Sequence, residues 1–362
     1  MKIGVLGFGQ LGRMLALSAS TLGHQMRFLV LSNEGSSSPL GKIFAHNNNL
    51  EVIKKFADDS DVVTYESENI DTKIVNQISK TSTVYPSDKS LHLTQHRARE
   101  KDLLKKLNIP CAPYELVNSI SDLKSAIDNI GLPAILKTAT EGYDGKGQFV
   151  IKSKSQINEA WKKMSGAESI LEGFIKFNRE LSIIAVRGIN GDLKYYPLVE
   201  NSHHEGILRL TIAPAQKISK SLQKKAESYM NSLIAEINHV GVITLELFES
   251  EDGLIVNEIA PRVHNSGHWT IEGAETSQFE NHIRAITNNP LGETAIKNKY
   301  NAMINIIGVH GPTNKVRKTN NAYLHLYDKE ERKNRKLGHI TITSNSHEEL
   351  KESISNLKEY LP

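Results

Sequence analysis

Val242-Ile243-Thr244-Leu245-Glu246-Leu247-Phe248, then Glu251-Asp252-Gly253, then Leu254-Ile255-Val256-Asn257-Glu258-Ile259 form the stretch that decides the fold. The outer pieces alternate in polarity and are rich in β-branched residues, and the Asp-Gly between them is typical of a hairpin turn. A three-residue loop over 251–253 places Glu246 directly opposite Glu258 and puts Val256 on the face of Glu258. Two opposed carboxylates repel unless a cation lies between them. The stretch therefore predicts a divalent-cation site or, alternatively, two solvated glutamates on an edge hairpin.

Cationic and hydrogen-bonding side chains begin directly after this hairpin, where Pro261 ends the second strand. They are Arg262, His264, Asn265 and Ser266. Oxygen ligands for a hard cation, next to donors for an anion, indicate an anion that becomes reactive beside a metal-bound phosphate. Asn257 can offer a further oxygen beside Glu258.

The composition is ordinary for a globular chain of two or three domains: 362 residues, 39% hydrophobic and 23% charged. Lys and Arg number 44 against 41 Asp and Glu, and the formal charge of +3 gives no electrostatic case for a nucleic-acid or membrane partner. The one cysteine, Cys111, excludes an internal disulfide and favours a cytoplasmic setting. We expect neither a signal peptide nor a transmembrane helix.

Residues 1–95 alternate between strand and helix patterns, which predicts a parallel sheet. Gly7-Phe8-Gly9-Gln10-Leu11-Gly12 follows the first strand. This motif permits a tight turn with close strand–helix packing, a phosphate or small-ligand edge, or a dinucleotide site. A dinucleotide site also needs an acidic residue about 20 positions on, and the candidate, Glu34, lies past the end of the second strand.

A second glycine-rich loop, Gly142-Tyr143-Asp144-Gly145-Lys146-Gly147-Gln148, follows a strand that ends in Lys137. Backbone N–H groups of such a loop, with two flanking lysines, can fold over phosphates. The loop lacks the Gly-Lys-Ser/Thr ending of a Walker motif. The alternative is a flexible exposed loop without a ligand.

Further along, Ser169 to Ile175 has the pattern of a buried strand with an exposed edge, where Glu172 can accept a hydrogen bond from an adenine amino group. Glu180 begins the next strand and can bind ribose hydroxyls. The pattern also predicts one charged helix over 88–107, one strand over 193–201, and a solvated charged loop over 328–339.

Taken together, these stretches resemble the ATP-grasp enzymes and, most closely, the N5-carboxyaminoimidazole ribonucleotide synthetase family. The resemblance covers nearly the whole chain, and its most specific mark is Asn257 to Trp269. Its other marks are Gly7–Met14, Gly142–Gln148 and Arg335–His339. It implies an α/β chain with an N-terminal parallel-sheet domain (1–95), a central two-part ATP-grasp domain (96–295) and a small C-terminal β-rich domain (296–362).

The activity implied by this resemblance is that of a ligase of purine biosynthesis. Such an enzyme uses ATP, Mg²⁺ and bicarbonate to make carboxyphosphate, and then carboxylates 5-aminoimidazole ribonucleotide. The resemblance also implies a cytoplasmic homodimer.

The resemblance assigns roles to individual residues as well. For metal it implies Glu246 and Glu258. For bicarbonate and carboxyphosphate it implies Arg262, His264, Asn265 and Ser266. For ATP it implies Arg97, Lys137, Gly142, Tyr143, Asp144, Gly145, Lys146, Gly147, Gln148, Glu172, Gly173, Phe174, Ile175, Glu180, His203, Asn257 and Glu258. For the ribonucleotide it implies Tyr143, Asp144, Lys146, Lys329, Arg335 and Lys336, with Glu66 or Glu68.

Two positions depart from the family pattern. Lys146 stands where many relatives have Arg, and Lys cannot make the bidentate fork. His96 stands where an acidic residue is common. The rival interpretations are a nicotinamide-dependent oxidoreductase, which leaves the glutamate hairpin unexplained, and a non-catalytic nucleotide-binding module, which has no need of an intact metal pair. A formate-using or biotin-dependent ligase is the nearest alternative within the fold.

Overall fold

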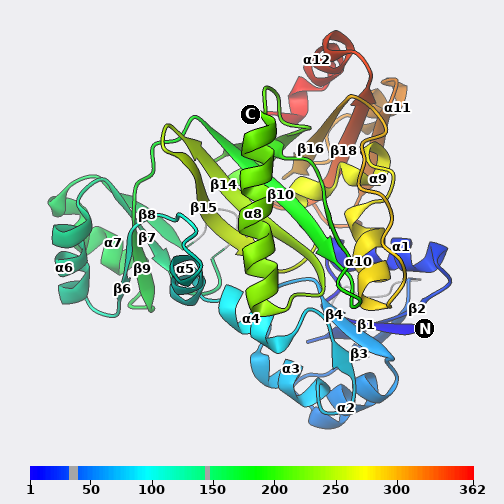
Figure 1. Cartoon of the computed structure of the whole chain (residues 1–362), viewed down its shortest axis with the longest axis horizontal. Coiled ribbons are helices and arrows are strands. Elements are labelled where there is room, and N and C mark those ends of the chain that lie inside the picture. The colour runs from blue at the N-terminus through cyan, green and yellow to red at the C-terminus, as the bar shows by residue number, and fades with distance from the viewer. Residues whose placement is uncertain (32–39, 143–146) are drawn as a thin grey trace.

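The computed structural model describes residues 1–31, 40–142 and 147–362 (Figure 1). Glu34 and four residues of the second glycine-rich loop, Tyr143, Asp144, Gly145 and Lys146, lie outside the described residues. No helix in the described ranges has the length and apolar character needed to cross a membrane.

The N-terminal unit is a parallel sheet with the order β3-β2-β1-β4-β5. Its core is continuous with that of the central unit, because Leu15 of α1 belongs to the same apolar cluster as Phe279 and Ile283 of α10 (Gln278–Ile286). The sequence patterns predict these elements except β3 and the separate helix α4. The elements are β1 (Lys2–Leu6), α1 (Gln10–Thr21), β2 (Gln25–Val30), β3 (Lys42–Ala45), α2 (Leu50–Asp58), β4 (Val62–Tyr65), α3 (Thr72–Ile78), β5 (Thr83–Val84) and α4 (Asp88–Thr94).

A small antiparallel sheet with the order β6-β9-β7-β8 follows, and Figure 1 shows helix α5 between it and the large sheet. Its own core includes Leu123, Leu136 and Leu171. Its elements are α5 (Arg97–Lys106), β6 (Tyr114–Val117), α6 (Ile120–Ile130), β7 (Ala134–Thr138), β8 (Gln148–Ile151), α7 (Ile157–Lys163) and β9 (Ser169–Gly173).

The large sheet runs β15-β14-β10-β12-β13-β16-β18-β17, with β11 paired to β10. The C-terminal strands therefore continue the sheet of the central unit, through the β13–β16 pairing of Leu210 with Ile304. Its elements are β10 (Arg179–Arg187), β11 (Leu193–Tyr195), β12 (Val199–His204), β13 (Ile207–Ala213), α8 (Lys220–Ile237), β14 (Gly241–Ser250), β15 (Gly253–Ala260), α9 (Thr270–Gly273), α10 (Gln278–Ile286), β16 (Tyr300–Ile307), α11 (Thr313–Lys318), β17 (Ala322–Leu326), β18 (Lys336–Ser344) and α12 (His347–Asn356).

Three expectations about elements are wrong. The helix expected over 88–107 is two helices, α4 and α5, because the Gln95 side chain donates to the backbone of Glu68 and the Arg97 backbone N–H donates to Ala139. The strand expected over 193–201 is broken into β11 and β12 around Pro197, which has no N–H for a ladder. The end of the loop expected over 328–339 belongs to β18 instead.

Two buried histidines fix the start of β14 against the N-terminal unit. The Val242 N–H donates to His282 Nδ1, and the Val242 carbonyl accepts from His239 Nε2. His282 also bonds Thr64 of β4 at 2.8 Å, and His239 bonds Ser90 of α4 at 2.8 Å. Burial lowers the pKa of His239 to about 4 and of His282 to about 3, so both rings are neutral at pH 7. Through these two histidines, hydrogen bonds fix β14, which carries Glu246, to Thr64 and Ser90 of the N-terminal unit.

Candidate active site

Glu246 and Glu258 lie directly opposite each other across the β14–β15 hairpin, as the sequence predicts. The expected three-residue loop is wrong, however, because Ser250 pairs with Gly253 and leaves a two-residue turn. The register shifts between Glu246 and Leu247, and Asn257 becomes the extra residue of a β-bulge. The bulge compensates for the shorter turn. It also corrects the expectation for Val256, which pairs with Leu247 and lies in the core instead of beside Glu258.

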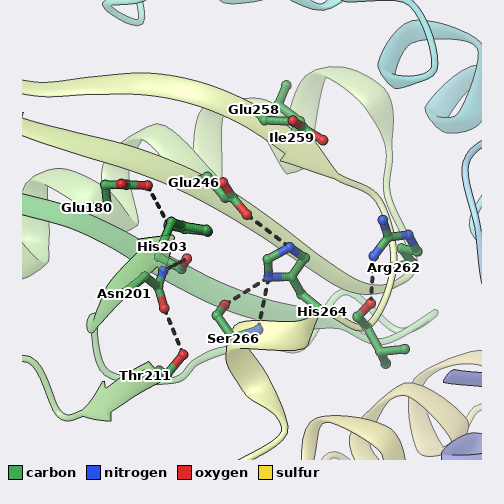
Figure 2. A network of polar contacts seen from close by, with 12 residues as sticks. Glu180, Asn201, His203, Thr211, Glu246, Glu258, Ile259, Arg262, His264 and Ser266 are labelled. Carbon is green, nitrogen blue, oxygen red and sulfur yellow. Dashed lines mark hydrogen bonds and ion pairs between the residues drawn. The ribbon is translucent and has the colours of Figure 1, made fainter. Parts of the chain in front are cut away.

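The side chain of Glu246 is held by His264 (Figure 2). His264 Nε2 lies 3.1 Å from Glu246 Oε1. His264 Nδ1 accepts from the Ser266 backbone N–H at 3.3 Å, so the ring proton of the neutral form lies on Nε2 and points at the carboxylate. Burial raises the pKa of Glu246, but the hydrogen bond and charge of His264 outweigh it and leave the pKa lowered. Glu246 is therefore an anion at neutral pH.

Glu258 is more open and meets Arg97. Arg97 Nη1 lies 3.4 Å from Glu258 Oε2, and Arg97 Nη2 donates to the carbonyl of Gly142 at 3.2 Å. Arg97 thus joins the hairpin carboxylate to the start of the second glycine-rich loop. The Glu258 side chain stays 34% exposed, and the long contact leaves lone pairs for another ligand. The described residues contain no group of three metal-ligating side chains, but Mg²⁺ commonly takes one or two carboxylates plus substrate phosphates.

Arg262, His264, Asn265 and Ser266 make up a segment that we call the anion loop. Its arginine is paired with a residue of the N-terminal unit: Arg262 Nη2 donates to Glu68 Oε1 at 2.9 Å, and Arg262 Nε donates to the other carboxylate oxygen. Despite burial, this arginine lowers the pKa of Glu68. One edge of the guanidinium is thereby committed. Asn265 Oδ1 is buried without a hydrogen-bond partner in the described ranges.

The structure brings Lys137 and Glu172 into contact in the small sheet. Lys137 Nζ lies 2.6 Å from Glu172 Oε2, and Lys101 Nζ lies 3.7 Å from the other oxygen. Burial opposes ionisation of Glu172, yet the two lysines lower its pKa to about 2. The carboxylate expected to face adenine therefore also anchors the lysine expected to face phosphate. Gly147 and Gln148 lead into β8, where Gln148 pairs with Lys137.

Beyond Gly173, the chain passes through Phe174, which is exposed, and Ile175 toward β10. Glu180 Oε2 lies 2.7 Å from His203 Nδ1 (Figure 2). Burial lowers the pKa of His203, but Glu180 outweighs it and leaves the pKa raised. Sequence reasoning missed Phe177, whose ring stacks on Phe248 at 4.5 Å between centroids. Side chains alternate along a strand, so Phe248, two residues after Glu246, is expected on the same face as Glu246, and this was the available signal for an apolar wall there.

The first glycine-rich loop binds an anion that the chain itself supplies. Gly9 and Gly12 donate their backbone N–H groups to the two carboxylate oxygens of Glu66, the second at 2.7 Å. Burial raises the pKa of Glu66 in spite of these bonds. A carboxylate thus occupies the place that a diphosphate needs in the dinucleotide interpretation.

The C-terminal residues reach this same loop. Lys329 Nζ donates to Gln10 Oε1, which joins positions 319 apart in the sequence. Arg335 Nη1 donates to the carbonyl of Glu330 at 3.3 Å within the charged loop, and Lys336 begins β18. Lys329 therefore lies against the N-terminal unit, while the Arg335 side chain bonds within its own loop.

Three family models match the chain: the ribonucleotide synthetase preATP-grasp domain over 1–95, the ATP-grasp domain over 102–279 and the phosphoribosylaminoimidazole carboxylase C-terminal domain over 301–353. The chain is 45% identical over 343 residues to the N5-carboxyaminoimidazole ribonucleotide synthase of Pseudomonas aeruginosa, and the aligned region covers 94% of each chain.

Solved structures agree with these matches. The N5-carboxyaminoimidazole ribonucleotide synthetase of Thermus thermophilus superposes with a TM-score of 0.93 at 43% identity, covering 99% of this chain and 98% of that one. The Aspergillus clavatus synthase in complex with ADP and 5-aminoimidazole ribonucleotide superposes with a TM-score of 0.90 at 32% identity, covering 99% and 98%.

Proposed function

We propose that phosphoryl transfer takes place at the Glu246–Glu258 hairpin. The chain belongs to the N5-carboxyaminoimidazole ribonucleotide synthase family, and it catalyses ATP-dependent carboxylation of 5-aminoimidazole ribonucleotide in purine biosynthesis. The observation that carries this assignment is the direct opposition of the two carboxylates. Arg97 lies against Glu258 and His264 against Glu246. ATP phosphates and bicarbonate therefore have separate hydrogen-bond donors, Arg97 and His264, on the two sides of the pair.

Mg²⁺ fits this pair, because both ligands are hard oxygens and Glu258 keeps free coordination capacity. When bound, the ion neutralises the negative charge of the phosphoryl group during its transfer. Glu246 and Glu258 would hold it, with Asn257 beside them. His264 keeps Glu246 ionised and oriented for this role.

ATP is assigned to the side of Arg97 and Lys137. These two cations, with the loop from Gly142 to Gln148, hold the phosphates, and the contact of Arg97 with the Gly142 carbonyl supports this grouping. Adenine is assigned to the edge formed by Glu172, Gly173, Phe174 and Ile175. The ribose is assigned to Glu180 and its partner His203.

The anion loop is assigned to bicarbonate. A bicarbonate oxygen attacks the γ-phosphorus of ATP, the bond from γ-phosphorus to the bridging oxygen breaks, and ADP leaves carboxyphosphate behind. Arg262 offers its uncommitted N–H groups to the carboxylate end, with Asn265 and Ser266 as further polar neighbours. The exocyclic amine of the ribonucleotide then attacks the carboxyl carbon, the C–O bond to phosphate breaks, and the departing phosphate accepts the proton that the amine loses.

The ribonucleotide is assigned to Lys329, Arg335 and Lys336, together with Tyr143, Asp144 and Lys146 of the second glycine-rich loop. Glu66 and Glu68 lie just past the end of β4 in the N-terminal unit, but their carboxylates already accept hydrogen bonds from Gly12 and Arg262. They would therefore reach the ribonucleotide only by exchanging these partners. The homodimer and the cytoplasmic location remain predictions.

The assignment of bicarbonate is tested by phosphate release from ATP, measured with and without bicarbonate and 5-aminoimidazole ribonucleotide. We expect release to require bicarbonate. Release that is unchanged after bicarbonate is removed would contradict the carboxyphosphate route.

Arg335→Ala tests the ribonucleotide side. A bidentate arginine suits the 5′-phosphate, so we expect the KM for the ribonucleotide to rise at least about tenfold, or about 1.4 kcal/mol. The KM for ATP and the melting temperature should stay near their wild-type values. Arg332→Ala, in the same charged loop, is the matched control. An unchanged ribonucleotide KM in Arg335→Ala would contradict the assignment of this loop to the ribonucleotide and would favour a solvated surface loop.

A further inference from the structure

The outer edge of β15 is covered along the segment that carries Glu258. The Val256 N–H donates to the carbonyl of Pro110 at 2.8 Å. Lys101 Nζ donates to the Asn257 carbonyl at 2.7 Å, and the Ile259 N–H donates to Glu100 Oε2 at 3.0 Å. An edge strand normally leaves such groups to water, and buried ones need partners. Two consecutive residues of α5 thus bond the backbone on either side of Glu258.

Both α5 side chains are unusually placed for charged residues, since Glu100 is 2% exposed and Lys101 is 1% exposed. Burying a charge is costly unless it is paired and hydrogen-bonded. Lys101 has a carboxylate neighbour, Glu172, at 3.7 Å. Burial raises the pKa of Glu100 to about 8, so its neutral form predominates at pH 7. Neither placement is needed to bury α5, because Leu103 and Leu104 on the same helix already supply an apolar face.

The bulge decides which side chain faces Glu246. A regular ladder continuing from the Leu247–Val256 pair would place Asn257 opposite Glu246 and turn Glu258 to the other face of the sheet. The extra residue at the bulge brings Glu258 into that place instead. The bonds to Lys101 and Glu100 lie one residue before and one residue after Glu258, where a slip of the register would break both.

We propose that Glu100 and Lys101 are positioning residues that hold the β15 bulge and thereby aim Glu258 at the cation. The proposal rests on the proposed function, in which Glu258 is a metal ligand. It extends that function to two residues of α5 that bond the backbone on either side of Glu258. The same helix begins with Arg97, so one element sets the Glu258 backbone and contacts its side chain.

The test separates the backbone from the metal. Lys101→Met and Glu100→Leu remove the two bonds, whereas Glu100→Gln keeps an acceptor for the Ile259 N–H. Lys106→Met is the matched control, since Lys106 lies on the same helix and pairs on the surface with Glu236. The first readout is hydrogen exchange of the Ile259 amide in metal-free protein. The second is Mn²⁺ affinity by electron paramagnetic resonance in the presence of ADP.

We expect Ile259 to exchange at least tenfold faster in Glu100→Leu, and both Lys101→Met and Glu100→Leu to weaken Mn²⁺ binding at least tenfold. Glu100→Gln and Lys106→Met should resemble wild type in both readouts. If Lys101→Met does not fold, the Glu100→Leu and Glu100→Gln pair decides the question. Wild-type Mn²⁺ affinity in Glu100→Leu, with affinity lost in Glu258→Gln, overturns this inference alone. Wild-type affinity in Glu258→Gln overturns the metal assignment itself.

Discussion

Glu66 and Glu68 lie just past the end of β4, and Glu246 and Glu258 lie opposite each other across the β14–β15 hairpin. In the first pair, each carboxylate has both oxygens bonded by protein donors: two glycine N–H groups for Glu66 and the Arg262 guanidinium for Glu68. In the second pair, Glu246 meets His264 through one oxygen, and Glu258 meets Arg97 at 3.4 Å.

The difference shows what distinguishes a structural carboxylate from a ligand. Side-chain exposure differs between the pairs, from 13% for Glu68 to 22% for Glu246 and 34% for Glu258, but the clearer difference lies in how many carboxylate oxygens are already bonded. In the first pair, Glu66 and Glu68, protein donors already bond every carboxylate oxygen, and we call it the completed pair; it joins the N-terminal unit to the glycine-rich loop and the anion loop. The second pair, Glu246 and Glu258, can still bind a cation, and we call it the open pair. Substitutions in the first pair should therefore change stability, and substitutions in the second pair should change turnover.

The largest expected effect is that of Glu258→Gln on turnover. The variant keeps the shape of the side chain and removes one charge of the open pair, so the cation and the transferred phosphoryl group lose stabilisation. We expect ATP turnover to fall at least about 100-fold, which corresponds to about 2.7 kcal/mol. Phosphate release at saturating Mg²⁺ measures this. The melting temperature should not fall, because one of two opposed carboxylates is neutralised.

Glu251→Gln is the control for this variant, since Glu251 lies in the exposed turn of the same hairpin. Its turnover should match that of wild type. Near-normal turnover of Glu258→Gln at saturating Mg²⁺ would show that the open pair is not a metal site.

Glu68→Gln should mainly lower the free energy of unfolding, in contrast to Glu258→Gln, which should mainly lower turnover. Arg262 then keeps a largely buried charge without its counterion, because the Arg262 and Glu68 side chains are only 16% and 13% exposed. Removing one partner of a buried pair costs about 3 kcal/mol or more, and partial exposure reduces this to about 2 kcal/mol. Denaturant unfolding measures the loss.

A Glu68→Gln, Arg262→Gln double variant serves as the control for stability, since it removes both charges. We expect it to recover part of the lost free energy of unfolding. If Glu68→Gln is as stable as wild type, the completed pair contributes no structural tie between the N-terminal unit and the anion loop.

The open pair is the part of the site that the sequence could predict, because its residues lie near each other along the chain. Alternation and an expected three-residue loop around the Asp-Gly turn placed Glu246 opposite Glu258. Even so, the turn was one residue shorter than expected, and the pairing is correct only because the bulge at Asn257 compensates. Local pattern defines a hairpin, whereas the extra residue of a bulge leaves no such pattern in the sequence.

The completed pair could not be predicted in this way. Glu66 lies 57 residues from Gly9, and Glu68 lies 194 residues from Arg262. No periodicity in the sequence reports contacts at such separations. The same holds for the division of the expected 88–107 helix, since Gln95 and Arg97 bond residues of two different units. The parallel sheet, by contrast, follows from local strand and helix patterns.

The smallest expected effect distinguishes the two members of the completed pair by the pH dependence of stability. Burial raises the pKa of Glu66 above its ordinary 4.5, whereas the charge of Arg262 outweighs burial and lowers the pKa of Glu68 below 4.5. Glu66 therefore binds its proton more tightly in the folded state, and its contribution to stability falls as pH rises above 4.5. Glu68 binds its proton less tightly in the folded state, so its contribution is complete above pH 4.5 and is lost as pH falls toward the folded pKa.

Denaturant unfolding of wild type, Glu66→Gln and Glu68→Gln across acidic and neutral pH measures both contributions. The wild-type advantage over Glu66→Gln should shrink as pH rises from 4.5, and the advantage over Glu68→Gln should grow as pH rises to 4.5 and then level off. One proton limits each slope to about 1.4 kcal/mol per pH unit. Parallel profiles for the two variants would contradict the opposite pKa directions. They would mean that the glycine N–H groups, together with the charges of Lys329 and Arg262, stabilise the Glu66 anion as fully as Arg262 stabilises Glu68.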